Sequence, residues 1–372
     1  MDASALIAAI ERLAPPALAE PWDNTGLLAG DPDTALRGPV VLTIDLSPSV
    51  MDEAAAAGAA AIVAYHPPIF RPISRLTTDN GRQRLVLRAL NAGMLLYSPH
   101  TALDAAPGGL NDWLARAVGT GDTRALRPAP VGSPRNKIIT FVPEAQADNV
   151  RSALAASGAG RIGAYERCSF AAPGTGTFFG GEGTDPAVGR AGRLEHVNEL
   201  RLEMICPASA TPLALDALRA MHPYEEPAID VYPLSATTER GVGAGRRVLL
   251  DQGTTLDRAC ERVKEHLGIE RLKYASPDDA PDRPVKTVGF CAGSGSELVD
   301  DAVANGCDLL VTGEMSHHEI LAATDKGLAV ILAGHTNTER GYLPEFAERL
   351  GAELPGLDIR VSEADRPPVR WV

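Results

Sequence analysis

The chain has 372 residues, enough for two or three domains with buried cores. Hydrophobic residues make up 45% and charged residues 22% of the chain, which excludes a wholly disordered, collagen-like or coiled-coil protein. The 35 basic and 48 acidic residues give a net charge of −13, which argues against a nucleic-acid-binding protein with a broad basic face.

Neither a membrane segment nor a cysteine framework is expected. The N-terminus lacks the basic stretch of a signal peptide, and the most apolar run, residues 54–64, is far shorter than the roughly 18 residues of a membrane span. We therefore expect a soluble, cytoplasmic protein. The five cysteines are scattered with no C-x-x-C pair, so any bound metal must be held by histidine and carboxylate side chains.

Short aliphatic runs alternate with alanine-rich stretches near both ends of the chain. This pattern predicts strand and helix units that feed largely parallel sheets. A helix is expected at residues 49–57. The expected buried strands are residues 40–46, 61–65, 94–97, 287–291, 308–312 and 329–333.

The middle of the chain has an organisation of its own. Residues 126–134, rich in proline and alanine, are expected to be a linker. The elements expected after it are a strand at 137–142, a helix at 148–157, a glycine-rich loop through Gly192, a strand at 200–206, a helix at 212–220 and a strand at 228–232. This order predicts an α+β ferredoxin-like domain over residues 133–236, inserted between two α/β halves, residues 1–132 and 237–372.

The two halves share a polar motif. The pattern His-Thr-x-x-acid occurs at His100–Asp104 and again at His335–Glu339, each time after an aliphatic strand. Alignment of the alanine-rich segments before it places His66 on Glu314. We therefore predict a duplicated, pseudo-symmetric α/β core in which the two acids face each other and Glu314 makes a hydrogen bond to a ligand residue.

Polar side chains follow four of the predicted strands at the carboxyl ends, where ligands bind in open α/β sheets. These residues are His66, His100, Asp104, Glu314, His335 and Glu339. Imidazoles and carboxylates without thiolate fit zinc, manganese, iron or nickel. Two such ions about 3.5 to 4 Å apart are a common hydrolytic arrangement. The sequence therefore predicts a divalent-metal site.

Simpler interpretations exist for several of these residues. Each histidine could be a structural residue with one hydrogen bond, although the repeated motif favours a shared site. His317 and His318 either support the ligands or belong to the exposed face of a surface helix. The turn from Gly293 to Ser296 could bind an anion at a helix N-terminus, but capping of that helix by Ser296 is the simpler interpretation.

Several motifs together resemble one protein family. They are W-D-N-T-G-L at 22–27, Y-H-P-P-I-F at 65–70, T-G-E-M-S-H-H at 312–318 and the two His-Thr-x-x-acid motifs. The chain resembles the NGG-interacting-factor-three-like family, whose members are also labelled GTP cyclohydrolase I type 2 homologues and dinuclear metal centre hexameric proteins. The middle segment looks like the insert of the longer members, which is similar to PII and CutA proteins.

The resemblance implies a homohexameric toroid with a metal pair in each chain and with the insert capping its openings. It assigns the metal ligands to His66, Asp104, His335 and Glu339, with Glu339 as the bridge and His100 beside the site. The cofactor would be a divalent transition metal, two ions per chain. One departure is Tyr65, because many bacterial members carry histidine there and a neutral phenol is a poor ligand.

Three functions are compatible with these expectations. The first is a metal-dependent hydrolase that acts on a nucleotide-like or other small substrate, with His100 as the catalytic proton carrier. The second is a non-catalytic metal-binding or metal-trafficking protein. The third is a regulatory assembly whose insert senses a small-molecule ligand. The expected partners are further copies of this chain and a small molecule, with neither a membrane nor a nucleic acid.

Overall fold

The computed structural model describes residues 1–278 and 280–369. The chain divides into two compact units. The core unit consists of residues 1–129 and of the chain from Thr238 onward, and the insert unit is Pro130–Thr237. The range predicted for the inserted domain, residues 133–236, lies within the second unit. Among the described residues, no helix has both the length and the apolar character that a membrane crossing needs.

The first sheet of the core unit has the strand order β1-β4-β3-β2-β15. The strands are β1 (Gly26–Ala29), β2 (Val40–Thr43), β3 (Ala61–Ala64), β4 (Leu95–Ser98) and β15 (Ile359–Val361). Strands β15, β2, β3 and β4 are parallel and β1 is antiparallel to β4. Every residue of β2, β3 and β4 is buried, which explains why these strands are continuous apolar runs in the sequence.

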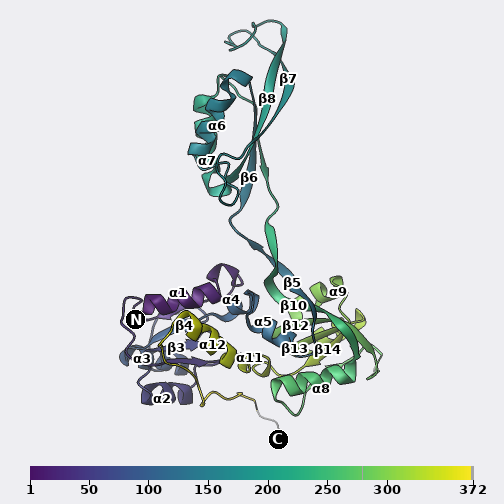
Figure 1. Ribbon diagram of the computed structural model, residues 1–372. Helices are drawn as coiled ribbons and strands as arrows, with labels where there is room; N and C mark the ends of the chain where they lie inside the picture. Colours follow the sequence, from purple (N-terminus) through teal and green to yellow (C-terminus); the bar gives the residue numbers. More distant parts are fainter. Residues whose placement is uncertain (279, 370–372) are drawn as a thin grey trace. The chain divides into compact units, whose positions relative to one another are not determined.

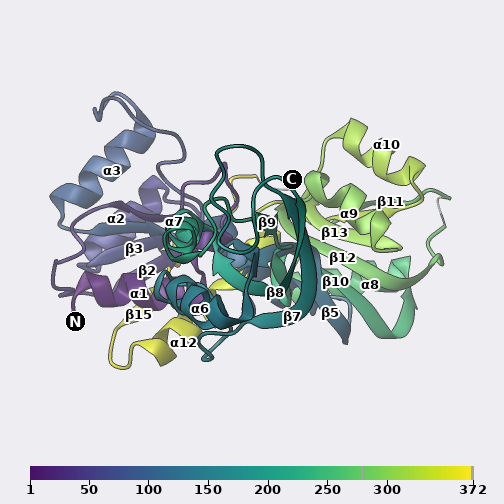
Figure 2. The same cartoon turned by 90° about the horizontal axis from the view of Figure 1, so that it is seen from above.

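The second sheet has the order β11-β14-β13-β12-β10-β5. The strands are β5 (Gly121–Val131), β10 (Thr237–Thr255), β11 (Lys273–Ala275), β12 (Pro284–Ser294), β13 (Leu309–Glu314) and β14 (Ala329–Leu332). Strands β12, β13 and β14 are parallel, while β11 is antiparallel to β14 and β10 is antiparallel to β12. In Figure 2, strands β2 and β3 of the first sheet are purple to blue, and strands β12 and β13 of the second sheet are green.

The predicted duplication of the core is confirmed by the order of its elements. In each half a helix precedes an antiparallel edge strand, and three parallel strands with two crossover helices follow. Two more helices close each half. The paired helices are α1 (Ala3–Leu13) and α8 (Leu256–Leu267), α2 (Pro48–Ala56) and α9 (Val299–Ala304), α3 (Gly81–Asn91) and α10 (His317–Asp325), α4 (His100–Ala105) and α11 (Asn337–Arg340), and α5 (Leu110–Ala115) and α12 (Leu343–Glu353). The single-turn helices are η1 (Pro16–Leu18), η2 (Glu144–Gln146), η3 (Ala208–Ala210) and η4 (Ser296–Leu298).

Local side chains set where several core helices begin. The Ser47 hydroxyl accepts a hydrogen bond from the backbone N–H of Val50 at the start of α2. Asn80 and Thr255 cap α3 and α8 in the same way. Ser316 forms a complete capping box with Glu319 at the start of α10. Each cap satisfies N–H groups that have no partner within the helix, which typically stabilises it by about 1 kcal/mol.

The halves exchange strands and share one hydrophobic core. Strand β15, from the end of the chain, pairs with β2 of the first sheet, and β5, which follows α5, forms the edge of the second sheet. The largest hydrophobic cluster of described residues contains Leu42 of the first sheet and Phe290 of the second. Neither half therefore has a complete sheet or core of its own.

The linker expected at residues 126–134 is wrong for most of its length. Residues through Val131 belong to β5, which pairs with β10. Pro128 and Pro130 have no N–H to donate, but β5 is an edge strand and needs partners on one side only. Proline content therefore indicated an edge strand here, not an unpaired linker.

The insert unit has the predicted ferredoxin-like fold. Its elements are β6 (Arg135–Val142), α6 (Ala147–Ala156), β7 (Phe170–Phe179), β8 (Leu194–Pro207), α7 (Thr211–Met221) and β9 (Ile229–Pro233). They form one antiparallel sheet of order β7-β8-β6-β9. Figure 1 shows α6 and α7 along one face of it, and the side chains buried between them include Ile138, Leu154 and Leu218.

The expectation of a glycine-rich loop through Gly192 is wrong over residues 170–179. This segment is β7, and all 10 of its residues pair with β8. Its small residues have low strand propensity, but β8 satisfies its backbone along the whole length, and this tertiary pairing outweighs the local preference.

Removal of the insert should leave a folded core unit. We expect a chain in which a short Gly/Ser linker replaces residues 133–236 to be monodisperse and to unfold cooperatively, because the core unit has its own sheets and hydrophobic cluster. Size-exclusion chromatography and thermal unfolding followed by circular dichroism measure this. A control chain with the same linker inserted after Gly132 tests for damage by the linker. Aggregation of the shortened chain alone would contradict independent folding of the core unit.

Candidate metal centre

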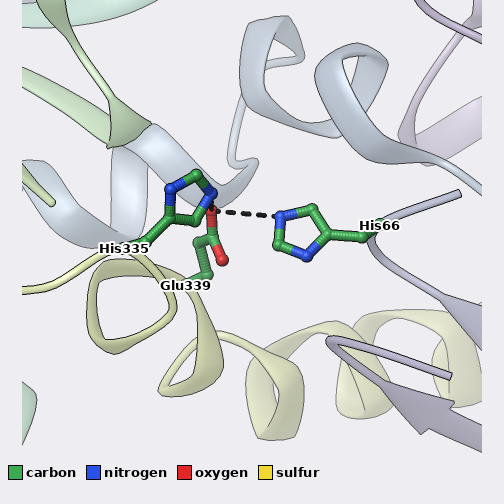
Figure 3. A group of neighbouring side chains, drawn as sticks. All are labelled: His66, His335 and Glu339. Carbon is green, nitrogen blue, oxygen red and sulfur yellow. Dashed lines mark ion pairs between the residues drawn. The ribbon is translucent and has the colours of Figure 1, made fainter. Parts of the chain in front are cut away.

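Three side chains from the two halves converge on one point. His66 follows β3, His335 follows β14 and Glu339 lies in α11, and one donor atom of each lies within 4.8 Å of the others. Glu339 Oε1 is 3.5 Å from His66 Nε2 and 3.3 Å from His335 Nε2. Figure 3 shows both rings turned toward the Glu339 carboxylate. Two imidazoles and a carboxylate in this arrangement could hold a divalent transition metal.

The far side of each ring is held by a carboxylate. His66 Nδ1 lies 3.0 Å from Asp45 Oδ1, and His335 Nδ1 lies 2.9 Å from Glu314 Oε1. A carboxylate on Nδ1 fixes the tautomer and leaves Nε2 free to ligate, which is the usual arrangement around metal-binding histidines. The hydrogen bond predicted for Glu314 is confirmed. Asp45 was missed, because the strand expected at residues 40–46 included it, whereas β2 ends at Thr43 and leaves Asp45 beyond the strand end.

Glu339 shows that a cation fits this group. The residue is only 1% exposed, and its Oε2 atom is buried without a hydrogen-bond partner among the described residues. Buried carboxylate oxygens without any partner are rare in folded proteins, because their desolvation is costly. A cation beside Glu339 would satisfy this oxygen.

Gly293 lies against the Glu339 carboxylate and the His335 ring, where a side chain would not fit. Gly293 has a φ of +64°, and a Cβ atom on it would lie 2.8 Å from Glu339 Oε1 and 3.1 Å from His335 Nε2. The negative charge of the Glu339 carboxylate, so close to Gly293, disfavours binding of an anion at the turn from Gly293 to Ser296. The simpler interpretation is not borne out either, because η4 begins after Gly295 without a side-chain cap and Ser296 lies inside it.

The acids around His66 hold its proton tightly when no metal is bound. Burial lowers the pKa of His66, but hydrogen bonds and charge from Asp45 and Glu339 outweigh it and raise the pKa to about 10. A cation at Nε2 would replace this proton and keep the positive charge that the acids require.

Asp104 lies outside the group of three. Its Oδ1 accepts a hydrogen bond of 2.8 Å from the hydroxyl of Tyr65. Burial raises the pKa of Asp104 to about 6, against the opposing effects of His100 and the Tyr65 hydrogen bond. The structure therefore brings together three of the four ligands assigned from the resemblance, and pairs the fourth with tyrosine.

His100 stands beside the group in an unusual backbone conformation. Its φ is +28°, which side-chain-bearing residues rarely adopt and which is a strain found mostly at functional sites. Its Nδ1 lies 2.7 Å from Asp23 Oδ1, and Thr101 donates to the other oxygen of Asp23 from both backbone and hydroxyl. The His100 and His66 ring centroids are 5.4 Å apart. Asp23 belongs to the W-D-N-T-G-L motif, whose role in orienting His100 only the structure shows.

A cavity of about 850 Å³ in the core unit is lined by the group of three, with His100, Asp104 and Asp45. The rings of Trp22 and Phe70 also line it, and both are substantially exposed. His317 and His318 are exposed at the start of α10 and are not among the lining residues, so the surface-helix interpretation holds for them.

Metal affinity should rise with pH. His66 is protonated below a pKa of about 10 in the metal-free protein, so binding releases its proton and the affinity should increase about tenfold per pH unit. Calorimetric titration with Zn²⁺ between about pH 6 and 8 measures this slope. His66→Gln should flatten it, and the surface variant His318→Gln should not. An affinity independent of pH in the wild type would contradict this account of His66.

Comparisons with known proteins agree with this geometry. The family model described as Duf34/NIF3 (NGG1p interacting factor 3) matches residues 1–368. A GTP cyclohydrolase 1 type 2 homolog of Halalkalibacterium halodurans is 36% identical over 345 residues, which cover 93% of this chain and 91% of that protein. NIF3-like protein 1 of Rattus norvegicus is 36% identical over 380 residues, covering 100% and 93%. The crystal structure of a Bacillus cereus protein related to NIF3 superposes with a TM-score of 0.67 at 33% identity and covers 100% of this chain and 99% of that one. The chain therefore belongs to the Duf34/NIF3 family.

Proposed function

We propose that this protein is a metal-dependent hydrolase that acts on a nucleotide-like or other small substrate. The observation that carries the proposal is the group of His66, His335 and Glu339, whose donor atoms converge at the wall of a large cavity. A divalent ion bound there would supply Lewis acidity and would lower the pKa of water. The protein side chains would supply orientation, substrate contacts and proton transfer.

The cavity suits a small molecule with a planar ring. Its volume of about 850 Å³ lies within the usual range for ligand pockets. Trp22 and Phe70, with ring centroids 6.1 Å apart, offer exposed faces on which such a ring could stack. Relatives named GTP cyclohydrolase 1 type 2 homolog support a nucleotide-like substrate.

His100 is the proposed catalytic proton carrier. Asp23 holds its Nδ1, so Nε2 is the nitrogen that can exchange a proton with a molecule in the cavity. Its ring meets the rings of Trp22 and Tyr65 edge to face, which keeps it in place. Residues from both halves thus hold the substrate, the proton carrier and the ligands around one cavity.

Elemental analysis tests the metal site. We expect at least one transition-metal ion per chain after reloading with zinc, manganese, iron or nickel and desalting, because three donor side chains and an unpartnered carboxylate oxygen converge there. His335→Ala should lose most of the metal, whereas His318→Ala, an exposed histidine outside the cavity, should keep it. Fewer than about a tenth of an ion per chain in the wild type would refute the proposed metal centre.

A substrate screen tests catalysis. We expect the metal-loaded protein, but not the chelated one, to consume GTP or another nucleotide in a chromatographic assay. His100→Gln should lower kcat by about 10²-fold at unchanged metal content, as removal of a general acid or base typically does. Equal rates for loaded and chelated protein would contradict the hydrolase. Metal transfer to an acceptor apo-protein without any turnover would favour the non-catalytic alternative.

A further inference from the structure

Tyr65 is fixed in place beside the metal-binding group. It directly precedes His66 and is only 3% exposed. Its backbone oxygen accepts a hydrogen bond of 2.7 Å from Ser98 Oγ in the neighbouring strand β4. Its ring centroid lies 5.0 Å from that of His66 and 5.3 Å from that of His100, in edge contact with the latter. These ring contacts and the buried backbone hold the side chain with its hydroxyl toward Asp104.

This fixed position commits the Tyr65 hydroxyl to Asp104. The hydroxyl donates to Asp104 Oδ1 over 2.8 Å, and Asn111 Nδ2 donates to the backbone oxygen of Asp104 over 3.2 Å. The hydroxyl donor and the carboxylate acceptor are thus both held in position by buried neighbours. This hydrogen bond uses one lone pair of Asp104, and the phenol that donates it is itself a poor metal ligand, so a second ion beside Asp104 would find no imidazole at position 65.

The second half offers no ligand at the equivalent position. The alignment that places His66 on Glu314 places Tyr65 on Gly313. A Cβ atom on Gly313 would lie 2.5 Å from the backbone oxygen of Gly293, so no other residue fits there without a shift of the backbone.

Within residues 1–278 and 280–369, the only group of three close histidine, cysteine or acidic donors is His66, His335 and Glu339.

We propose that this protein binds one transition-metal ion per chain, and that the hydrogen bond between Tyr65 and Asp104 takes the place of the ligands that a second ion would need. The inference rests on the metal centre of the proposed function, but not on its catalytic activity. It assigns Tyr65 as the residue that sets the number of ions. The site then has one ion and, next to it, a neutral phenol paired with a carboxylate.

Native mass spectrometry of the desalted, zinc-reloaded full-length chain tests the proposal. We expect one ion per chain in the wild type and two in Tyr65→His, because an imidazole is a good zinc ligand and leaves Asp104 free to bind. The double variant Tyr65→His with Asp104→Asn should return to one ion, as should Tyr65→Phe, which frees Asp104 but adds no ligand. Tyr97→Phe is the matched control, since Tyr97 is a buried tyrosine of the same sheet that does not line the cavity.

The wild-type count alone can overturn the inference, even if Tyr65→His fails to fold. Two tightly bound ions in the wild type would refute it while leaving the proposed function intact, and so would a single ion in a folded Tyr65→His variant. No bound ion in the wild type would instead refute the metal centre itself. Titration of the metal-free protein with Co²⁺ gives an independent count, because the visible absorption of the bound ion should saturate at one equivalent.

Discussion

The core unit depends on Arg246, a fully buried charge at the junction of its halves. Its guanidinium makes two hydrogen bonds to Asp112, at 2.7 and 3.0 Å. It also donates to the backbone oxygens of Gly243, Gly245, Ala105 and Ala106. A buried charge is tolerated only with a complete set of partners, and removal of one partner from such a pair typically costs about 3 to 5 kcal/mol. Arg246 satisfies this condition by binding segments far apart in the sequence.

The pairing of Arg246 with Asp112 also positions residues of the candidate metal centre. Ala105 and Ala106 directly follow Asp104, so Arg246 on β10 fixes the segment that carries His100 and Asp104. Asn111 in the following helix, α5, accepts a hydrogen bond of 2.9 Å from the backbone N–H of Ala292. This bond ties the first half to the residue before Gly293.

A buried carboxylate, Asp365, joins the segments that carry Glu339 and Asp45. Asp365 accepts hydrogen bonds from the guanidinium of Arg340, the neighbour of Glu339, and from the backbone N–H of Ile44, the neighbour of Asp45. The Arg246–Asp112 pair and the Arg340–Asp365 pair thus orient residues around the cavity, and Asp365 links the halves through the N–H of Ile44. With Asp23, Asp45, Glu314 and Glu339 gathered around three histidines, the site has an excess of acid that a divalent cation would balance.

The sequence by itself indicated the parallel strands, the duplicated core and the strand-end residues from which the group of His66, His335 and Glu339 comes. Buried strands such as β3 and β14 are continuous apolar runs, and His66 and His335, which follow them, each lie at the carboxyl edge of their own sheet. Only the tertiary structure decided that Asp45 and Asp23 hold the histidine rings, that Tyr65 pairs with Asp104, and that residues 170–179 form a strand. The physical reason is that these features are interactions between partners distant in the sequence. Local periodicity in the sequence indicates which face of a helix or strand is buried. It does not indicate which distant side chain will pack against that face.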